Sequence, residues 1–212
     1  MNRLFAALHR RSRQKKARLF VDLLRPTAAT RILNVGGTGE RAGLAEQFES
    51  FYPHHDRIVG GGLSFVDVRD YRLSFPRARA VVFDGCALPF PDQSFDIVYS
   101  NAVIEHLPSR EMQQRFAQEV QRVGRAWFVT TPNLWYPVEP HYHLPLVQFL
   151  PPRSQRRLVT ALGRVPYPVL ILLERRELGR LFLSGRVIGC RVTFYPETLI
   201  AFGPAAAPPI RL

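Results

Sequence analysis

Residues Phe83–His106 read FDGCALPFPDQSFDIVYSNAVIEH, and this stretch carries the strongest structural signal in the chain. It begins at the end of an apolar run, residues 80–83, which Asp84 follows directly. A second apolar run, residues 95–100, comes after a turn that holds two prolines. A short carboxylate just after a buried strand is poorly placed for core packing and well placed for a ligand cleft at the end of that strand. The alternative for Asp84 is the N-cap of the following turn.

Short apolar strands, glycine turns and helices are predicted on both sides of this stretch. Further strands are expected at residues 31–35, 57–59 and 126–130. A helix is expected over residues 109–123, because Ser109 is a good N-cap, apolar residues recur at helical spacing and Gly124 suits the C′ position. Strands that alternate with helices predict an α/β fold with a parallel, doubly wound sheet.

The two ends of the chain complete the predicted organisation. Before residue 31, a helical stripe of leucines and Phe20 ends ahead of Pro26. Towards the other end, residues 174–182 have a helical pattern, and residues 186–194 and 198–202 read as two strands around a turn. We expect a basic N-terminal arm (1–17), a main domain (18–203) and a flexible tail (204–212).

Residues 132–168 interrupt the alternation of strands and helices. They hold eight of the 18 prolines, together with the aromatic and histidine side chains of Trp135, Tyr136, His141, Tyr142, His143 and Phe149. A Pro-rich segment of this length inside a compact domain is commonly a lid or a binding loop. We therefore expect it to shape a binding site.

Composition and charge exclude several classes of protein. The chain has 212 residues, of which 46% are hydrophobic and 22% charged, so wholesale disorder is excluded. No apolar run is long enough to cross a bilayer, and two cysteines, Cys86 and Cys190, predict a reducing compartment rather than a disulfide scaffold. These features predict a cytoplasmic protein.

The excess positive charge is concentrated near the N-terminus. The net charge is +12, and residues 1–25 hold eight basic side chains against one acidic side chain, Asp22. The simplest interpretation is that these basic side chains lie on a solvated helix. The alternative is a peripheral contact between residues 1–25 and an anionic membrane or nucleic acid.

With these observations in place, the chain resembles the class I S-adenosylmethionine-dependent methyltransferases. The resemblance rests on the glycine turn after residues 31–35, on Asp84, on the strand at residues 95–100 and on Glu105-His106. Residues 129–142, VTTPNLWYPVEPHY, are similar to a sub-branch with this loop. The resemblance covers about residues 18–203. It implies a Rossmann-like, seven-stranded, mostly parallel sheet with helices on both faces and an antiparallel last strand at about residues 198–202.

The resemblance also implies which residues would bind S-adenosylmethionine. The glycines of the first turn would pass beneath its methionine part, Asp84 would accept a hydrogen bond from its adenine amino group, and residues 100 and 101 would line the cleft. By this resemblance the expected cofactor-binding residues are Asn34, Gly36, Gly37, Gly39, Gly62, Asp84, Gly85, Cys86, Ser100 and Asn101.

At two positions the sequence departs from the family pattern. The family usually has an acidic residue at the start of the glycine turn, where this chain has Asn34. It also usually has an acidic residue at the end of the second strand, to hold the ribose hydroxyls, where this chain has Gly62. Each missing charge-assisted hydrogen bond would forfeit roughly 1.5–3 kcal/mol. Asp67 or Asp70 are alternative ribose partners.

Histidines are the candidate catalytic residues. An oxygen nucleophile benefits from a general base, and histidine suits this role near neutral pH. We expect His106, His141 and His143 to serve the reaction, with ordinary structural histidines as the alternative. Glu139 beside these histidines also suggests a metal, but no second cluster with fixed spacing supports one, so we predict none. Cys86 is interpreted as a small packing residue rather than a nucleophile.

The predicted function is methyl transfer from S-adenosylmethionine to a small-molecule, glycan or lipid-linked acceptor. The alternative from another class is a non-catalytic methyltransferase-fold protein that binds lipid or nucleic acid through its basic arm. Nucleic-acid methylation is a third interpretation. It predicts a basic groove on the body of the protein, whereas most of the excess charge lies in residues 1–25.

Overall fold

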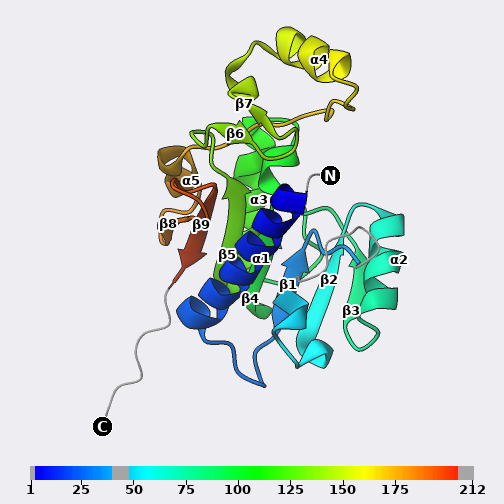
Figure 1. Ribbon diagram of the computed structural model, residues 1–212. Coiled ribbons are helices and arrows are strands. Elements are labelled where there is room, and N and C mark those ends of the chain that lie inside the picture. Colours follow the sequence, from blue (N-terminus) through cyan, green and yellow to red (C-terminus); the bar gives the residue numbers. More distant parts are fainter. Residues whose placement is uncertain (1–2, 40–47, 205–212) are drawn as a thin grey trace.

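The computed structural model describes residues 3–39 and 48–204 and shows a seven-stranded sheet with helices on both faces (Figure 1). The strand order is β3-β2-β1-β4-β5-β9-β8, which confirms the predicted Rossmann-like α/β fold. Its strands are β1 Ile32–Val35, β2 Ile58–Gly62, β3 Arg79–Val82, β4 Phe95–Asn101, β5 Gly124–Pro132, β8 Arg186–Cys190 and β9 Thr198–Gly203. The helices are α1 Arg3–Leu24, α2 Phe65–Ser74, α3 Arg110–Val123, α4 Pro152–Ala161 and α5 Arg175–Leu181. Short 3₁₀ turns are η2 Phe48–Ser50, η3 His55–Arg57, η4 Ile104–His106 and η5 Val147–Phe149.

The strand directions create a ligand-binding edge. Strands β1 to β5 are mutually parallel, and β9 runs antiparallel to β5, as expected for the last strand. Strand β8 is antiparallel to β9 and ends at Cys190, so the strand predicted for residues 186–194 is shorter than expected. The strand order reverses between β1 and β4, whose ends meet where Val35 pairs with Ser100. Open α/β sheets bind ligands at such a switch point.

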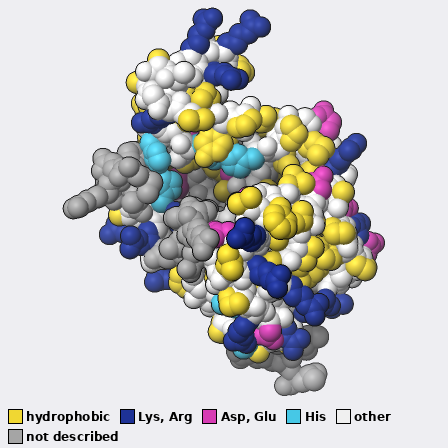
Figure 2. Space-filling view, turned by 90° about the vertical axis from the view of Figure 1, so that its right-hand side faces the viewer, with side chains coloured by type: hydrophobic (Ala, Val, Ile, Leu, Met, Phe, Trp, Pro, Cys, Tyr) yellow, Lys and Arg dark blue, Asp and Glu magenta, His cyan; other side chains and the backbone are white. Residues whose placement is uncertain are grey.

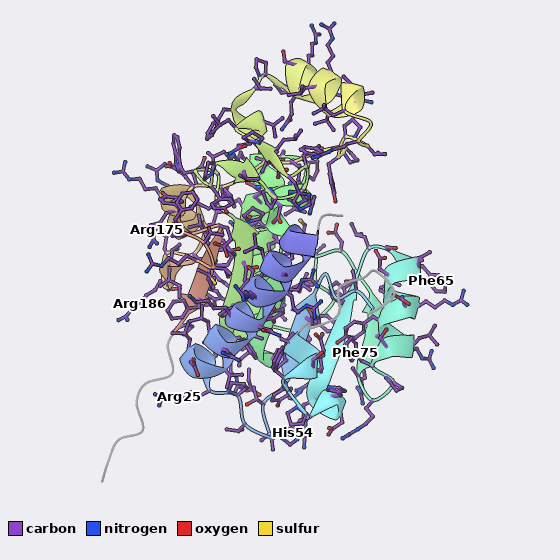
Figure 3. All side chains as sticks on the ribbon, in the orientation of Figure 1. Arg25, His54, Phe65, Phe75, Arg175 and Arg186 are labelled. Carbon is purple, nitrogen blue, oxygen red and sulfur yellow. The ribbon has the colours of Figure 1, made fainter. Side chains whose placement is uncertain are left out.

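Two hydrophobic cores cover the two faces of the sheet, because successive strand residues point to opposite sides. Ile32 belongs to the core beneath α1 and α2, whereas its neighbour Leu33 belongs to the core beneath α3 and α5. Directly after α2, Phe75 points towards the sheet and is buried, whereas Phe65 at the start of α2 points to solvent (Figure 3). The cores therefore hold the switch point rigidly from both sides.

Helix α3 forms as predicted, although its end differs from the prediction. The Ser109 hydroxyl accepts a hydrogen bond from the Met112 amide at 3.3 Å, as an N-cap should. Gly124, however, has φ −100° and begins β5 instead of taking a left-handed C′ conformation. A Cβ at Gly124 would lie 2.6 Å from Val98 Cγ2, so close packing explains this glycine.

Helix α1 crosses the sheet as one continuous element and includes residues 17 and 18, where we expected the arm to end (Figure 1). Most basic residues of the helix that the structure describes are at least partly exposed, but Lys16 departs from the solvated basic helix considered from the sequence, since it is 8% exposed. The reason is helical spacing, because Lys16 lies one turn before Phe20 and two turns before Leu24, and both of these residues are buried against the sheet.

Residues 132–168 are more ordered than the predicted loop. They contain the short strand pair β6 Val138–Glu139 and β7 Leu144–Pro145, then η5 and α4. A small separate core of Tyr142, Val147 and Val159 holds this unit together. It projects beyond the carboxyl end of the sheet (Figure 1). Of the predicted flexible tail, all but Pro204 lies outside the described residues.

Candidate active site

A cavity of about 340 Å³ opens at the switch point, at the carboxyl ends of β1 and β2. Ligand sites in proteins commonly have volumes of about 300–1,000 Å³. Six of the predicted site residues line the cavity: Gly36, Gly37, Gly62, Asp84, Gly85 and His106. The structure thus brings together residues that lie up to 70 positions apart in the sequence.

The turn after β1 requires glycine at its first position. Gly36 has φ +85°, and a Cβ there would lie 2.2 Å from Val103 Cγ2. The amides of Gly36 and Gly37 donate to the Gly61 carbonyl of β2 at 2.7 and 3.2 Å. These bonds hold the turn flat against β2, so the turn forms the floor of the cavity.

Asp84 holds the turn after β3 and also lines the cavity. Its Oδ1 accepts a hydrogen bond from the Cys86 amide at 2.8 Å, which closes the turn after β3, and the residue also lines the cavity. The Cys86 thiol lies 3.4 Å from the Met112 carbonyl, and burial raises its pKa to about 11. At neutral pH Cys86 is therefore protonated, as suits a packing residue.

Besides Cys86, four predicted cofactor residues do not line the cavity. Ser100 is fully buried in β4, and Gly39 packs against α2, where a Cβ would meet the Asp70 carbonyl at 2.4 Å. Asn101 Oδ1 accepts hydrogen bonds from Lys16 Nζ and Thr130 Oγ1, each at 2.7 Å. The fourth residue, Asn34, is buried in β1 and faces a carboxylate that the sequence analysis did not identify.

That carboxylate belongs to Glu49 of η2. Asn34 Nδ2 donates to Glu49 Oε1 at 2.5 Å, and the Tyr71 hydroxyl donates to the same oxygen at 2.9 Å. Burial raises the pKa of Glu49 to about 7. An acidic group thus does lie beside the glycine turn, although it comes from a segment 15 residues later. No local motif marks it, because the contact is made only by folding.

A second buried carboxylate, Glu105, lies between the end of β5 and the two histidines His106 and His141. Its Oε2 accepts a hydrogen bond from the Thr131 hydroxyl at 3.1 Å, and Oε1 has no hydrogen-bond partner among the described residues. Potential ligand atoms of Glu105, His106 and His141 all lie within 4.8 Å of one another, so this group could hold a metal ion.

The rings of His106 and His141 meet edge to face, with their centroids 5.0 Å apart. His141 Nδ1 lies 2.6 Å from Oε1 of buried Glu139, which orients its ring. Tyr167 covers both rings, with centroid distances of 5.4 Å to His106 and 4.9 Å to His141. Burial, and then the neighbouring His141, lower the pKa of His106 to about 4, so His106 is neutral at pH 7.

His143, the third predicted catalytic histidine, lies apart from this pair. Its Nε2 is 2.9 Å from Nε2 of His9 on α1. The residue has a left-handed backbone, with φ +51°. The structure therefore joins His106 with His141 and places His143 against α1.

A family model described as "Methyltransferase domain" matches residues 36–126, which span the cavity from the glycine turn to the start of β5. Over these residues the chain is similar to the class I methyltransferases. Their cofactor is S-adenosylmethionine. No curated protein matches the chain.

Solved structures share the methyltransferase fold at low sequence identity. An S-adenosylmethionine-dependent methyltransferase from Thermotoga maritima, described as a possible histamine N-methyltransferase, is 13% identical with a TM-score of 0.62. The match covers 93% of this chain and 91% of that one. A methyltransferase from Methanosarcina mazei is 14% identical with a TM-score of 0.56, over 87% of this chain and 95% of that one. At these identities the likeness concerns the fold alone.

The cavity has features that fit this cofactor. Gly62 leaves space, because a Cβ there would have only the Gly36 backbone within 4 Å, at 3.7 Å. A side chain at position 62 would therefore project into the cavity. Asp67, in the first turn of α2, also lines the cavity, whereas Asp70 packs beside Gly39. Of the two alternative ribose partners named from the sequence, Asp67 is the one at the cavity.

Proposed function

We propose that this methyltransferase transfers a methyl group from S-adenosylmethionine to a hydroxyl of a glycan or lipid-linked acceptor. The observation that carries the proposal is the cavity that Gly36, Gly62 and Asp84 share with His106. When bound, the cofactor supplies a methyl group that its sulfonium already activates. The protein then has to align the acceptor with this methyl group, exclude water and activate the hydroxyl.

In this proposal the residues divide into a cofactor side and an acceptor side. Asp84 accepts a hydrogen bond from the adenine amino group, and Asp67 holds the ribose hydroxyls in place of the residue missing at Gly62. On the acceptor side, His106 reaches the cavity, and the Glu139–His141 pair lies behind it. His106 and His141 activate the acceptor hydroxyl for loss of its proton. His143 is left out of this assignment, because its ring lies against His9.

The unit around α4 supports an acceptor linked to an anionic lipid. Residues 140–173 contain four arginines and no acidic residue. Leu158, Leu162 and Val165 are 42%, 51% and 86% exposed beside these arginines. Figure 2 shows Lys and Arg side chains at the tip of this projection, with hydrophobic side chains below them. A basic and apolar surface next to the acceptor side suits an amphiphilic, anionic acceptor. Among the described residues, no helix has the length and apolar character needed to span a membrane.

Calorimetric titration with S-adenosylmethionine and S-adenosylhomocysteine tests the cofactor side. We expect micromolar binding to the wild-type chain and a loss of at least tenfold in Asp84→Ala. Asp92→Ala, which removes an exposed carboxylate from the following turn, is the control and should bind normally. Failure of the folded wild-type chain to bind either compound would overturn the proposal and favour a non-catalytic protein.

Sedimentation with vesicles tests the acceptor class. We expect the chain to bind phosphatidylglycerol vesicles more strongly than phosphatidylcholine vesicles, and the variant with Arg153, Arg156 and Arg157 replaced by Gln to lose this preference. Replacement of Arg10 and Arg11 on α1 tests the basic arm in the same assay. If only the α1 variant loses binding, the α4 unit does not recognise the acceptor.

A further inference from the structure

We propose that Glu105, His106 and His141 form a binding site for a zinc ion at the acceptor side of the cavity. The three residues come from η4 and from the turn after β6, and their potential ligand atoms lie within 4.8 Å of one another. Two imidazoles and one carboxylate, with a fourth position open, are a common ligand set of catalytic zinc. The site itself is argued from these residues, and only its use in activating the acceptor rests on the proposed function.

Only one of the two carboxylate oxygens of Glu105 has a hydrogen-bond partner among the described residues. The side chain is completely buried, and Thr131 satisfies only Oε2. Oε1 has no partner among the described residues, although the rings of His106 and His141 face the same space. An unpaired buried carboxylate oxygen is costly. A cation bound between Oε1 and the two rings would remove this cost.

Neighbouring groups orient the side chains of the proposed ligands. A histidine that binds a metal usually donates its other ring N–H to a carboxylate or a backbone carbonyl. His141 Nδ1 lies 2.6 Å from Glu139 Oε1, which leaves Nε2 for an ion. The His106 ring is held from its faces instead, by the rings of His141 and Tyr167 with centroids 5.0 and 5.4 Å away. Thr131 plays the corresponding part for Glu105.

Hydrogen bonds around η4 hold the proposed ligands in position. Gln113 Nε2 donates to the carbonyls of Ile104 and Ile171 at 3.0 and 2.9 Å, which joins η4 to the chain at Ile171. The Ile171 amide in turn donates to the Glu105 carbonyl at 2.8 Å. Ligand atoms about 2.1 Å from zinc lie roughly 3.4 Å apart. Because the present separations are at most 4.8 Å, binding would draw any two ligand atoms together by no more than about 1.4 Å.

An ion at this position would act on the acceptor directly. His106 lines the cavity, so the open coordination position would face the space where the acceptor lies. A hydroxyl bound to zinc loses its proton far more readily than a free one. The proton of the hydroxyl would pass to solvent water, while the acceptor oxygen would form a bond to the methyl carbon and the carbon–sulfur bond of the cofactor would break. The histidines would then activate the acceptor through the ion and would not have to take its proton themselves.

Zinc titration of the untagged, full-length chain after removal of metal tests the site. We expect one equivalent of zinc to bind with submicromolar affinity in competition with a chromophoric chelator. His106→Ala and His141→Ala should each weaken binding at least tenfold. His143→Ala and His54→Ala are matched controls and should bind zinc as the wild-type chain does. Glu105→Gln is informative only if circular dichroism shows that it folds.

Cobalt provides a second measurement that is independent of activity. A tetrahedral cobalt complex absorbs visible light strongly, and we expect this absorption in the wild-type chain and its loss in His141→Ala. Equal zinc affinity in the wild-type chain and in the His106→Ala/His141→Ala double variant would overturn the proposal. Asp84→Ala separates the two proposals, since it should abolish cofactor binding and leave zinc binding intact.

Discussion

Lys16 of α1 donates a hydrogen bond from Nζ to Oδ1 of Asn101, the last residue of β4, over 2.7 Å. Thr130 of β5 donates to the same oxygen, also over 2.7 Å. The basic N-terminal helix is thereby fastened to the edge of the sheet that carries the cavity. Of its basic residues, Arg10, Arg11, Lys15 and Arg18 remain exposed, so α1 combines a structural role with a charged outer face.

Replacement of Lys16 by Met should change how stability depends on pH. Burial lowers the pKa of Lys16 to about 8 from 10.5. A lysine whose pKa is lowered in the folded state opposes folding while it is charged, and the penalty is relieved as pH rises from about 8 to 10.5. Across this pH range we expect the free energy of unfolding of the wild-type chain to increase relative to that of Lys16→Met. Urea unfolding at several pH values measures it, and parallel curves for the two proteins would contradict the prediction.

Replacement of Glu49 by Gln should remove a pH dependence of stability whose sign is opposite to that caused by Lys16. The pKa of Glu49 is raised from 4.5 to about 7, so its protonated form is favoured in the folded state. Its contribution to stability is complete below about pH 4.5 and is lost as pH rises through 7. Glu49→Gln should therefore gain stability relative to the wild-type chain between these values, by up to about 3 kcal/mol. Glu111→Gln, at an exposed position, should show no such gain between pH 5 and 8.

Replacement of Gly36 by Ala should destabilise the floor of the cavity. A non-glycine residue at φ +85° is strained, and the new Cβ would also lie 2.2 Å from Val103 Cγ2. We expect a loss of about 1–3 kcal/mol in the free energy of unfolding, together with weaker cofactor binding. Gly163→Ala is a matched control, since Gly163 has φ +69° but nothing within 4 Å of the added carbon. Equal losses in the two variants would mean that the contact with Val103 is unimportant.

Replacement of Asp67 by Asn should weaken cofactor binding. If Asp67 accepts hydrogen bonds from the ribose, loss of its charge should reduce affinity for S-adenosylmethionine and S-adenosylhomocysteine about tenfold, because bonds to charged groups contribute roughly 1.5–3 kcal/mol. Asp70→Asn, one turn later on α2, should change affinity less than twofold. Calorimetry on both variants separates the two carboxylates, and the reverse ranking would assign the ribose to Asp70.

Local sequence pattern predicts most strands of the large sheet, helix α3, the glycine turn and the stretch from Asp84 to His106. These features depend on neighbours in the chain. Hydrophobic periodicity, caps and turns act over a few residues, so Ser109 and Gly36 could be interpreted correctly from local pattern. The prediction of a loop over residues 132–168 missed β6, β7 and α4, because prolines hid their short periodic segments.

Only the tertiary structure decided which polar groups meet. Glu49 reaches Asn34, Lys16 reaches Asn101, and Glu105 and His106 face His141 across 35 residues or more. The same packing separated His141 from His143, which the sequence had grouped together. Such contacts follow from the crossing of α1 over the sheet and from the position of the β6–α4 unit. No periodicity encodes them, because the partners are brought together by long-range packing and not by spacing along the chain.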